Sequence, residues 1–537
     1  MPTRWYSLRS KKMDETWFYV LSLFAIIQLI LIFSFQQQTK KRHKILPPSP
    51  PSRPIIGHLH LLKSPIIHRT LQRLSLQYGS IFSLKLGFLP FVVISSPIAV
   101  EECFTKNDIV LANRPQVLAG KHLHYNWTTL GAASYGPLWQ NLRRLTTLEL
   151  FSSNRLKSFA GIRAQEVRSL VKALFGGTLL RNGGSSQSEK YGKVEMESKF
   201  SGLSFNILTR ILTGEKYISF SDENDDDDAR QEADKFLGLM REVFKLTGVS
   251  NMVDCLPVFR WINFRNVEGR MVAARKKMDD FLDGLIEECR KKRTQNGEKK
   301  TTAMIYKLLD LQEFEPANYS DQLIKGIIMV ILIAGTDTSA VTMEWALSLL
   351  LNHPNVLQKA REEIDNYKGI NNDELVEEVD LPNLPYLQCI INETLRLFPA
   401  APLLIAHQAS EDITISGYNI DKGKSILINA WAIHRDPSIW EDPLSFRPER
   451  FEGLKSEDYR FTFIPFGLGR RSCPGATLAN RLIGLTLATL IQCFDWERVD
   501  ENNVDLTEGP GLTMPKAKPL VAMCRARKSI INVLSNM

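Results

Sequence analysis

The segment Phe466–Gly475 holds the chain's most specific chemical signal, a cysteine set in a glycine-rich turn. A thiolate at Cys473 could ligate a metal, and glycines at 467, 469 and 475 would let the backbone turn tightly against a flat partner. Backbone N–H groups in such a turn can point at the sulfur and lower its basicity. These residue types at this spacing favour a rigidly held metal thiolate.

Two features beside the cysteine strengthen this interpretation. Arg471 could bind an acidic group at the rim of the metal's carrier. The segment Ala476–Thr489 is predicted to be a helix, so Cys473 would precede a helix N-terminus, where negative charge is favoured. The alternative is a buried structural cysteine, a common fate of this residue.

The segment resembles the haem-ligating loop of the cytochrome P450 superfamily. The pattern Phe-x-x-Gly-x-Arg-x-Cys-x-Gly is matched by Phe466, Gly469, Arg471, Cys473 and Gly475. The resemblance implies bound haem b with the Cys473 thiolate as axial iron ligand, which favours O–O cleavage. It also implies that this loop, Gly467 included, forms part of the haem-binding surface.

A second polar cluster interrupts Leu323–Leu351, an apolar segment that predicts a long buried helix. Gly335 would leave room for a flat ligand, while Asp337 and Thr338 supply an acid and a hydroxyl suited to relaying protons. The alternative is a local helix kink, with Ser or Thr bonded to the preceding turn. The cluster matches a second P450 pattern, and the resemblance implies that Thr338 and Asp337 carry protons inward during O–O cleavage.

Three further residues are candidates for holding the haem. Trp139 and Arg143 lie four residues apart, hence on one face of a predicted helix, and could clamp a carboxylate. A core Trp beside a surface Arg is the alternative. The resemblance implies that this pair binds a haem propionate and that His407 contacts a propionate as well. Ala406 stands where relatives have proline, which leaves the placement of His407 open.

A structural triad is also implied. Glu393 and Arg396 lie one helical turn apart, a pairing that contributes little on a solvated helix. The resemblance joins them to Arg450 in a buried cluster behind the haem. Loss of one member would then leave an uncompensated buried charge.

Composition and length are those of a globular protein. The 537 residues include 44% hydrophobic and 23% charged residues, and the net charge is +8. The basic residues are dispersed, so a membrane surface or an acidic partner is favoured over nucleic acid. Strands are expected at Ile81–Leu86 and Pro90–Ile94, and most of the remainder is helical. The predicted fold class is mainly α with small β-sheets, the cytochrome P450 fold, in one large domain.

The N-terminal region predicts membrane attachment. Trp17–Phe35 is long and apolar enough to span a bilayer, and the basic cluster Lys40–Lys44 favours a cytosolic location for everything that follows. Proline-rich residues 46–57 predict a stiff hinge. We therefore expect an N-terminal segment (1–45), a hinge (46–57) and a haem-thiolate catalytic domain (58–537). Whether Met1 or Met13 is the working start stays open.

A narrower resemblance concerns the substrate. Three segments look like those of plant A-type P450s near the isoflavone 2'/3'-hydroxylase group: Leu46–Pro50, Asn107–Pro115 and Phe463–Gly467. The resemblance implies oxygenation of a flavonoid, isoflavonoid, xanthone, lignan or other phenolic, with a terpenoid or xenobiotic as alternative. By analogy, the substrate would be contacted by the segments 117–130, 403–405 and 511–514 and by residue 333.

The resemblance also implies a location and partners. We expect a single-pass protein of the endoplasmic reticulum membrane that receives electrons from NADPH through a separate P450 reductase, with cytochrome b5 as a second candidate donor. Arg144 and Arg470 are candidates for the docking face, or ordinary solvated arginines. An O₂-independent haem-thiolate isomerase or dehydratase and a non-catalytic haem-binding membrane protein remain alternatives. Both would be expected to lose the acid–threonine pair that is present here.

Overall fold

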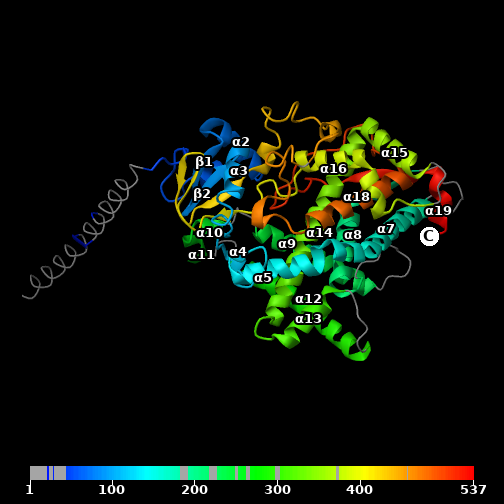
Figure 1. Cartoon of the computed structure of the whole chain (residues 1–537), viewed down its shortest axis with the longest axis horizontal. Coiled ribbons are helices and arrows are strands. Elements are labelled where there is room, and N and C mark those ends of the chain that lie inside the picture. Colours follow the sequence, from blue (N-terminus) through cyan, green and yellow to red (C-terminus); the bar gives the residue numbers. More distant parts are fainter. Residues whose placement is uncertain are drawn as a thin grey trace, which may run out of the picture.

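A computed structural model describes residues 44–181, 191–216, 227–247, 252–261, 266–296, 303–369, 374–455 and 457–537, together with Leu21, Ser22 and Gln28. The predicted membrane span and the acidic run 222–228 therefore lie wholly or largely outside the described residues. Most of the described chain is helical, and the strands at 81–86 and 89–94 lie beside the helix at 67–78 (Figure 1).

The described α-helices begin and end as follows: α2 (Ile67–Tyr78), α3 (Pro97–Phe104), α4 (Leu118–His122), α5 (Pro137–Thr146), α6 (Ser153–Ser158), α7 (Ala160–Arg181), α8 (Met196–Thr213), α9 (Asp227–Thr247), α10 (Met252–Cys255), α11 (Val258–Trp261), α12 (Val267–Asn296), α13 (Met304–Phe314), α14 (Asp321–Asn352), α15 (Pro354–Lys368), α16 (Pro385–Leu397), α17 (Ala430–Ile433), α18 (Ala476–Cys493) and α19 (Ile531–Ser535). The predicted helix at 323–351 is confirmed as α14, and the one at 476–489 as α18. The predominantly helical fold class agrees with the prediction.

Three small sheets account for the described strands. Their bounds are β1 (Ile81–Leu86), β2 (Leu89–Ile94), β3 (Gly192–Glu195), β4 (His407–Gln408), β5 (Ile413–Ile415), β6 (Tyr418–Ile420), β7 (Ser425–Ile428), β8 (Phe494–Glu497) and β9 (Val521–Ala526). The orders are β1-β2-β7-β4, β3-β9-β8 and β5-β6. The antiparallel β1–β2 pair begins with Ile81 opposite Ile94, so both predicted strands are confirmed.

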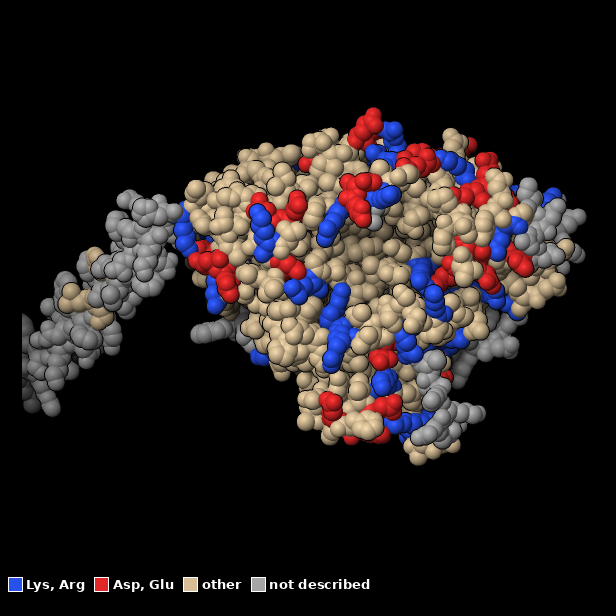
Figure 2. Space-filling view, in the orientation of Figure 1, with Lys and Arg blue, Asp and Glu red and all other residues tan. Residues whose placement is uncertain are grey.

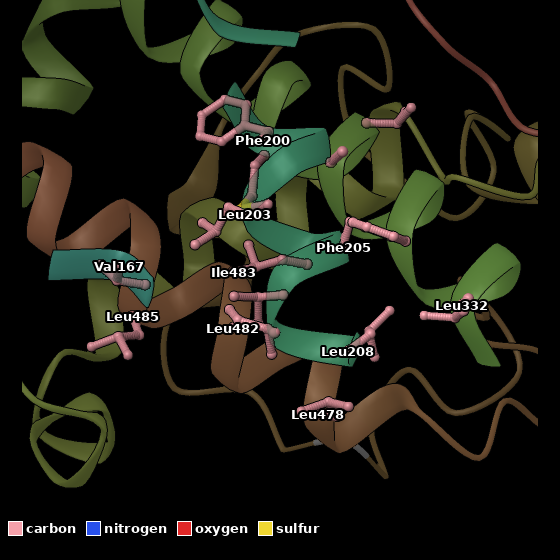
Figure 3. Close-up of a cluster of buried hydrophobic side chains, with 14 of the residues drawn as sticks. Val167, Phe200, Leu203, Phe205, Leu208, Leu332, Leu478, Leu482, Ile483 and Leu485 are labelled. Carbon is pink, nitrogen blue, oxygen red and sulfur yellow. The ribbon is translucent and has the colours of Figure 1, made fainter. Parts of the chain in front are cut away.

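Helix α14 runs through the core because its sequence offers no polar face. Ser320 caps its start by accepting a hydrogen bond from the Leu323 N–H, and α15 begins directly after it with Pro354 at its first position. Helix α14 packs against α8 and α18. Figure 3 shows this contact region, where Leu208 of α8, Leu332 of α14 and Leu478 of α18 belong to one buried cluster. The cluster fixes the helix that carries Asp337 and Thr338 relative to the helix that follows Cys473.

The proline-rich segment is attached to the first sheet. Ser83 of β1 donates a backbone N–H to the Pro48 carbonyl at 2.8 Å, and His58 Nε2 lies 2.8 Å from the Pro50 carbonyl. Pro47 and Pro50 are buried. From Pro47 onward the expected hinge is therefore bonded to the domain.

Two described helices, α14 and α18, are long and apolar enough to cross a membrane by composition alone. Each has 72% of its most apolar window buried inside the molecule. Both are core helices of the domain. The predicted anchor at Trp17–Phe35 is outside the described residues apart from three positions.

Candidate functional site

Cys473 lies between the short 3-10 helix η7 (Gly469–Arg471) and α18. It is the exposed member of the seven cysteines, and the other six are buried. Burial nevertheless raises the pKa of its thiol, while backbone N–H groups of Gly475 and Ala476 and the charge of Arg143 lower that pKa. The sulfur is thus accessible yet shielded from bulk water, with donors aimed at it that favour the thiolate.

The turn that presents Cys473 depends on left-handed backbone. Gly467 and Gly469 both have φ of +67°. A Cβ on Gly469 would also lie 2.2 Å from Asp108 Oδ1, so no larger residue fits there. The Cys473 N–H donates to the Phe466 carbonyl at 2.9 Å, which closes the turn.

The candidate clamp residues lie around this turn. Arg143 of α5 donates to the carbonyl of Ser472, next to the cysteine, at 2.8 Å. Arg471 places its guanidinium 4.3 Å from the centre of the Trp139 ring and donates to the Ala112 and Ala133 carbonyls. Burial, reinforced by Arg143, lowers the pKa of Arg471 to about 10. The structure thus brings together Trp139, Arg143 and Arg471 as the sequence suggested.

A further cation in this region was missed from the sequence. Arg114 is buried and donates to the carbonyls of Ile405 and Ala406 at 2.7 and 2.8 Å, while its Nε has no hydrogen-bond partner. Burial and the charge of Arg471 lower its pKa to about 9. The one signal available in the sequence was its position within Asn107–Pro115, a segment used only to narrow the resemblance.

His407 sits beside these cations in β4. Its Nδ1 lies 2.8 Å from the Leu111 carbonyl, and its ring packs edge-on against Phe104. Burial, Arg114 and Arg471 together lower its pKa to about 3, so the ring is neutral. A neutral imidazole held through Nδ1 has Nε2 left as a hydrogen-bonding group.

The arginines around Cys473 indicate what kind of ligand this site could bind. Arg114, Arg143 and Arg471 lie close enough to perturb one another, yet none forms an ion pair with a carboxylate in the described part of the chain. Buried guanidinium groups need compensation by negative charge. An accessible thiol flanked by uncompensated cations fits a metal–carboxylate cofactor, and haem b, with one iron and two propionates, meets both requirements.

The two members of the acid–threonine pair on α14 have different hydrogen-bond partners. The Thr338 hydroxyl donates back to the Ala334 carbonyl at 2.6 Å, and Ala334 is exposed although Ile333 is buried. Asp337 accepts a hydrogen bond from Thr513 at 2.7 Å. Burial raises the pKa of Asp337 despite that bond. The pair therefore has the groups of a proton relay, with the bond to the preceding turn that the kink alternative predicted for Thr338.

The expectation for Gly335 needs correction. A Cβ at this position would lie 2.8 Å from Cδ1 of Leu208, on the neighbouring helix α8. The glycine therefore permits close packing of two helices, and the space it leaves is filled by Leu208 rather than by a ligand. Sequence alone could not show which neighbour faced the missing side chain.

Comparison with known proteins decides the family, since the cytochrome P450 family model matches residues 47–523. The chain belongs to the cytochrome P450 family. This P450 is 49% identical to cytochrome P450 81Q32 of Catharanthus roseus, over 96% of the chain and 98% of that protein. It is 49% identical to an isoflavone 3'-hydroxylase of Medicago truncatula (94% and 97% covered) and 46% identical to the (+)-piperitol/(+)-sesamin synthase of Sesamum radiatum (95% and 96% covered).

The predicted family and enzyme class are thereby confirmed. P450s bind haem through a cysteine thiolate and catalyse monooxygenation with reducing equivalents from NADPH. The likeness to plant isoflavone hydroxylases, inferred from three short segments, is confirmed by nearly full-length relatives.

The three residues expected behind the haem of this P450 form one hydrogen-bonded unit. Arg396 donates to both oxygens of Glu393, at 2.7 and 2.8 Å, and Arg450 Nε donates to Glu393 Oε1 at 2.9 Å. Glu393 and Arg396 are fully buried. Arg396 also donates to the carbonyls of His434 and Pro443, so the unit ties α16 to the loop before the haem-ligating turn.

The segment 117–130 of this P450 has an unusual backbone. Tyr125, Asn126 and Trp127 are consecutive residues with φ between 52° and 57°, a left-handed turn that costs roughly 1–2 kcal/mol per residue. The Tyr125 hydroxyl donates to Asp279 of α12 at 2.6 Å, and Arg275 stacks on the Tyr125 ring at 3.5 Å. These contacts hold a strained loop where the family resemblance expects substrate contacts.

Proposed function

We propose that this P450 is a membrane-anchored monooxygenase that inserts one oxygen atom from O₂ into an aromatic plant metabolite. A flavonoid, isoflavonoid, lignan or related phenolic is the favoured substrate class. The observation that carries the reaction class is the accessible Cys473 sulfur beside three arginines that form no ion pair with a carboxylate among the described residues. Relatives named for isoflavones and for piperitol and sesamin support the substrate class.

We assign separate roles to the residues that would bind the haem and to those that would deliver protons. Cys473 would ligate the haem iron, while Arg114, Arg143 and Arg471, with Trp139 and His407, would hold the propionates. Bound haem supplies the redox chemistry that activates O₂. Asp337 and Thr338 would deliver protons to the reacting side.

Electrons would come from a separate NADPH-dependent reductase, and cytochrome b5 is a second candidate donor. Arg144 is exposed, whereas Arg470 pairs with Asp108 at 3.2 Å, which makes Arg144 the stronger candidate for a docking contact. Figure 2 shows basic and acidic side chains interspersed on the visible face, so docking would rely on local contacts rather than on a face of one sign. The predicted N-terminal span would hold the enzyme in the endoplasmic reticulum membrane.

The test uses microsomes that carry the full-length protein and a plant P450 reductase. Flavonoids, isoflavones, xanthones, lignans, indoles and terpenoids are supplied with NADPH, and products are identified by mass spectrometry. We expect a gain of one oxygen on one phenolic class, absent without NADPH and absent with Cys473→Ser microsomes. A gain only on terpenoids would overturn the substrate class, and a rearranged product formed without NADPH would overturn the monooxygenase assignment.

A further inference from the structure

The loop between β8 and β9 contacts the acid of α14. The Thr513 hydroxyl donates to Asp337 Oδ2 at 2.7 Å, across 176 residues of sequence. Thr513 is buried. Among the described residues, it is the one hydrogen-bond donor to this carboxylate, and Asp337 Oδ1 is left free. A buried carboxylate with a single neutral donor depends on that donor for its position and for much of its stability as an anion.

Two hydrogen bonds of the Met514 backbone, directly after Thr513, hold this part of the loop in place. The carbonyl of Met514 accepts from Trp345 Nε1 at 2.8 Å, and the Met514 N–H donates to the Ala400 carbonyl at 3.0 Å. Because Trp345 and Asp337 belong to the same helix, the loop is fixed to α14 near the acid. The Thr513 hydroxyl is therefore held in place by the contacts of its loop with the core.

The charged groups around Asp337 come from four elements. Arg241 of α9 attracts negative charge at Asp337 and pairs with Glu197 of α8 at 3.2 Å. Glu344, farther along α14, and Lys516, in the Thr513 loop, interact with each other, and Glu195 caps the start of α8. The side chain of Glu197 is 36% exposed, so the Arg241–Glu197 pair reaches solvent. Glu197 also interacts electrostatically with Asp337, so a carboxylate that reaches solvent belongs to the surroundings of the acid.

We propose that Thr513 is a positioning residue for proton delivery in this P450: its hydroxyl holds Oδ2 of Asp337 and leaves Oδ1 free to carry protons. Oδ1 takes a proton arriving from the Arg241–Glu197 side and releases it toward Thr338. Asp337 ends in the charge state in which it began, and the bond from Thr513 to Oδ2 is kept. The proposal rests on the proposed monooxygenase function for its purpose, but the contact can be tested without turnover.

The first experiment is a double-mutant cycle on unfolding of the haem-loaded, full-length protein. Wild type, Thr513→Val, Asp337→Ala and the double variant are unfolded in urea between pH 5.5 and pH 8, followed by circular dichroism and by the haem absorbance. We expect Thr513→Val to shift the unfolding equilibrium constant about tenfold toward the unfolded state at pH 8, the effect of losing a hydrogen bond to a charged group. The shift should shrink as the pH falls, because a protonated carboxyl needs the donor less.

Asp337→Ala is the matched background. In the Asp337→Ala background, Thr513→Val should shift the unfolding equilibrium constant by about threefold or less, with no dependence on pH. Thr513→Ser, which keeps the hydroxyl, should behave as wild type. An equal shift in both backgrounds at every pH would show that Thr513 acts by packing alone and would overturn the proposal.

The second experiment measures the use of NADPH with the reductase and the substrate found in the panel above. Thr513→Val should release several-fold more hydrogen peroxide per product than wild type, most strongly at high pH, and Thr513→Ser should restore the wild-type ratio. An unfolding cycle that shows coupling, combined with an unchanged peroxide ratio, would overturn the positioning role and leave the proposed function intact. If wild type forms no oxygenated product at all, the proposed function fails, while the cycle still decides whether Thr513 holds Asp337.

Discussion

At Cys473, the chemistry depends on one sulfur that is accessible but kept from bulk water. Its flanking N–H groups and Arg143 favour the thiolate, and the turn is closed by its own backbone. The surrounding arginines form no ion pair with a carboxylate in the described part of the chain, which fits the binding of a ligand that carries carboxylates. Single-residue changes at this site should therefore alter the cofactor's spectrum and the use of electrons more than the fold.

We predict that Cys473→Ser abolishes the thiolate-type absorbance of the reduced carbon-monoxide complex, because serine offers no thiolate to the iron. Difference spectroscopy of purified protein is the measurement. Cys493→Ala, at the end of the helix α18 that follows Cys473 and buried in the core, is the matched control and should keep the spectrum. A thiolate-type spectrum in Cys473→Ser would exclude Cys473 as the ligand.

Thr338→Ala should uncouple NADPH use from product formation. The substitution removes the hydroxyl that we propose relays protons, so hydrogen peroxide should increase at least several-fold at the expense of product. Thr342→Ala is the control, since Thr342 makes the same bond to the preceding turn, donating to the Thr338 carbonyl at 2.8 Å, and is buried. Equal peroxide ratios in the two variants would contradict the role assigned to Thr338.

At the level of elements, α14 connects the acid–threonine pair to the core. It approaches α8 closely because Gly335 has no side chain, and the same helix holds the Thr513 loop through Trp345. The triad of Glu393, Arg396 and Arg450 plays a corresponding part behind the haem-ligating turn. Such contacts position the chemistry without touching a substrate.

We predict that Gly335→Ala destabilises the protein by about 1–2 kcal/mol. Overpacking against Leu208 costs about 1–3 kcal/mol, and only about 1 kcal/mol is recovered from the better helix propensity of alanine. Gly284→Ala in α12 is the control: no atom lies within 4 Å of its Cβ, so it should stabilise by about 0.5–1 kcal/mol. Urea unfolding of both variants measures the difference, and two changes of the same sign would contradict the packing role.

Across the whole molecule, Glu508 joins parts of the chain that are far apart in sequence. It accepts hydrogen bonds from His68 and Arg69 of α2 and from Trp431 of α17. Burial disfavours its charge, but the bonds from His68 and Arg69 outweigh burial and lower its pKa to about 2. The Glu508 carboxylate therefore stabilises the attachment of α2 to the loop between β8 and β9.

The lowered pKa of Glu508 determines how its contribution to the free energy of unfolding depends on pH. Glu508 contributes stability above the pKa of an unfolded glutamate, about 4.3, and this stability is lost as the pH falls toward 2. We predict that Glu508→Gln costs on the order of 2 kcal/mol at neutral pH and that its difference from wild type shrinks below pH 4. Urea unfolding as a function of pH measures this difference. Glu441→Gln, at an exposed site, should show no such convergence, and parallel curves for wild type and Glu508→Gln would contradict the assignment.

The amino-acid sequence was sufficient to predict the family, which the comparisons confirm, and to predict the roles of the Cys473 loop and of the acid–threonine pair, which stay predictions. Short motifs, as in Phe466–Gly475, and local apolar patterns, as in the helix α14, carry these signals. Prediction from the sequence also assigned the wrong purpose to Gly335 and passed over Arg114. The tertiary structure was needed to show that Leu208 fills the space beside Gly335, that Arg114 forms no ion pair among the described residues, and that Thr513 bonds to Asp337. Each of these depends on contacts between segments distant in sequence, and a residue's type and its neighbours along the chain do not specify such contacts.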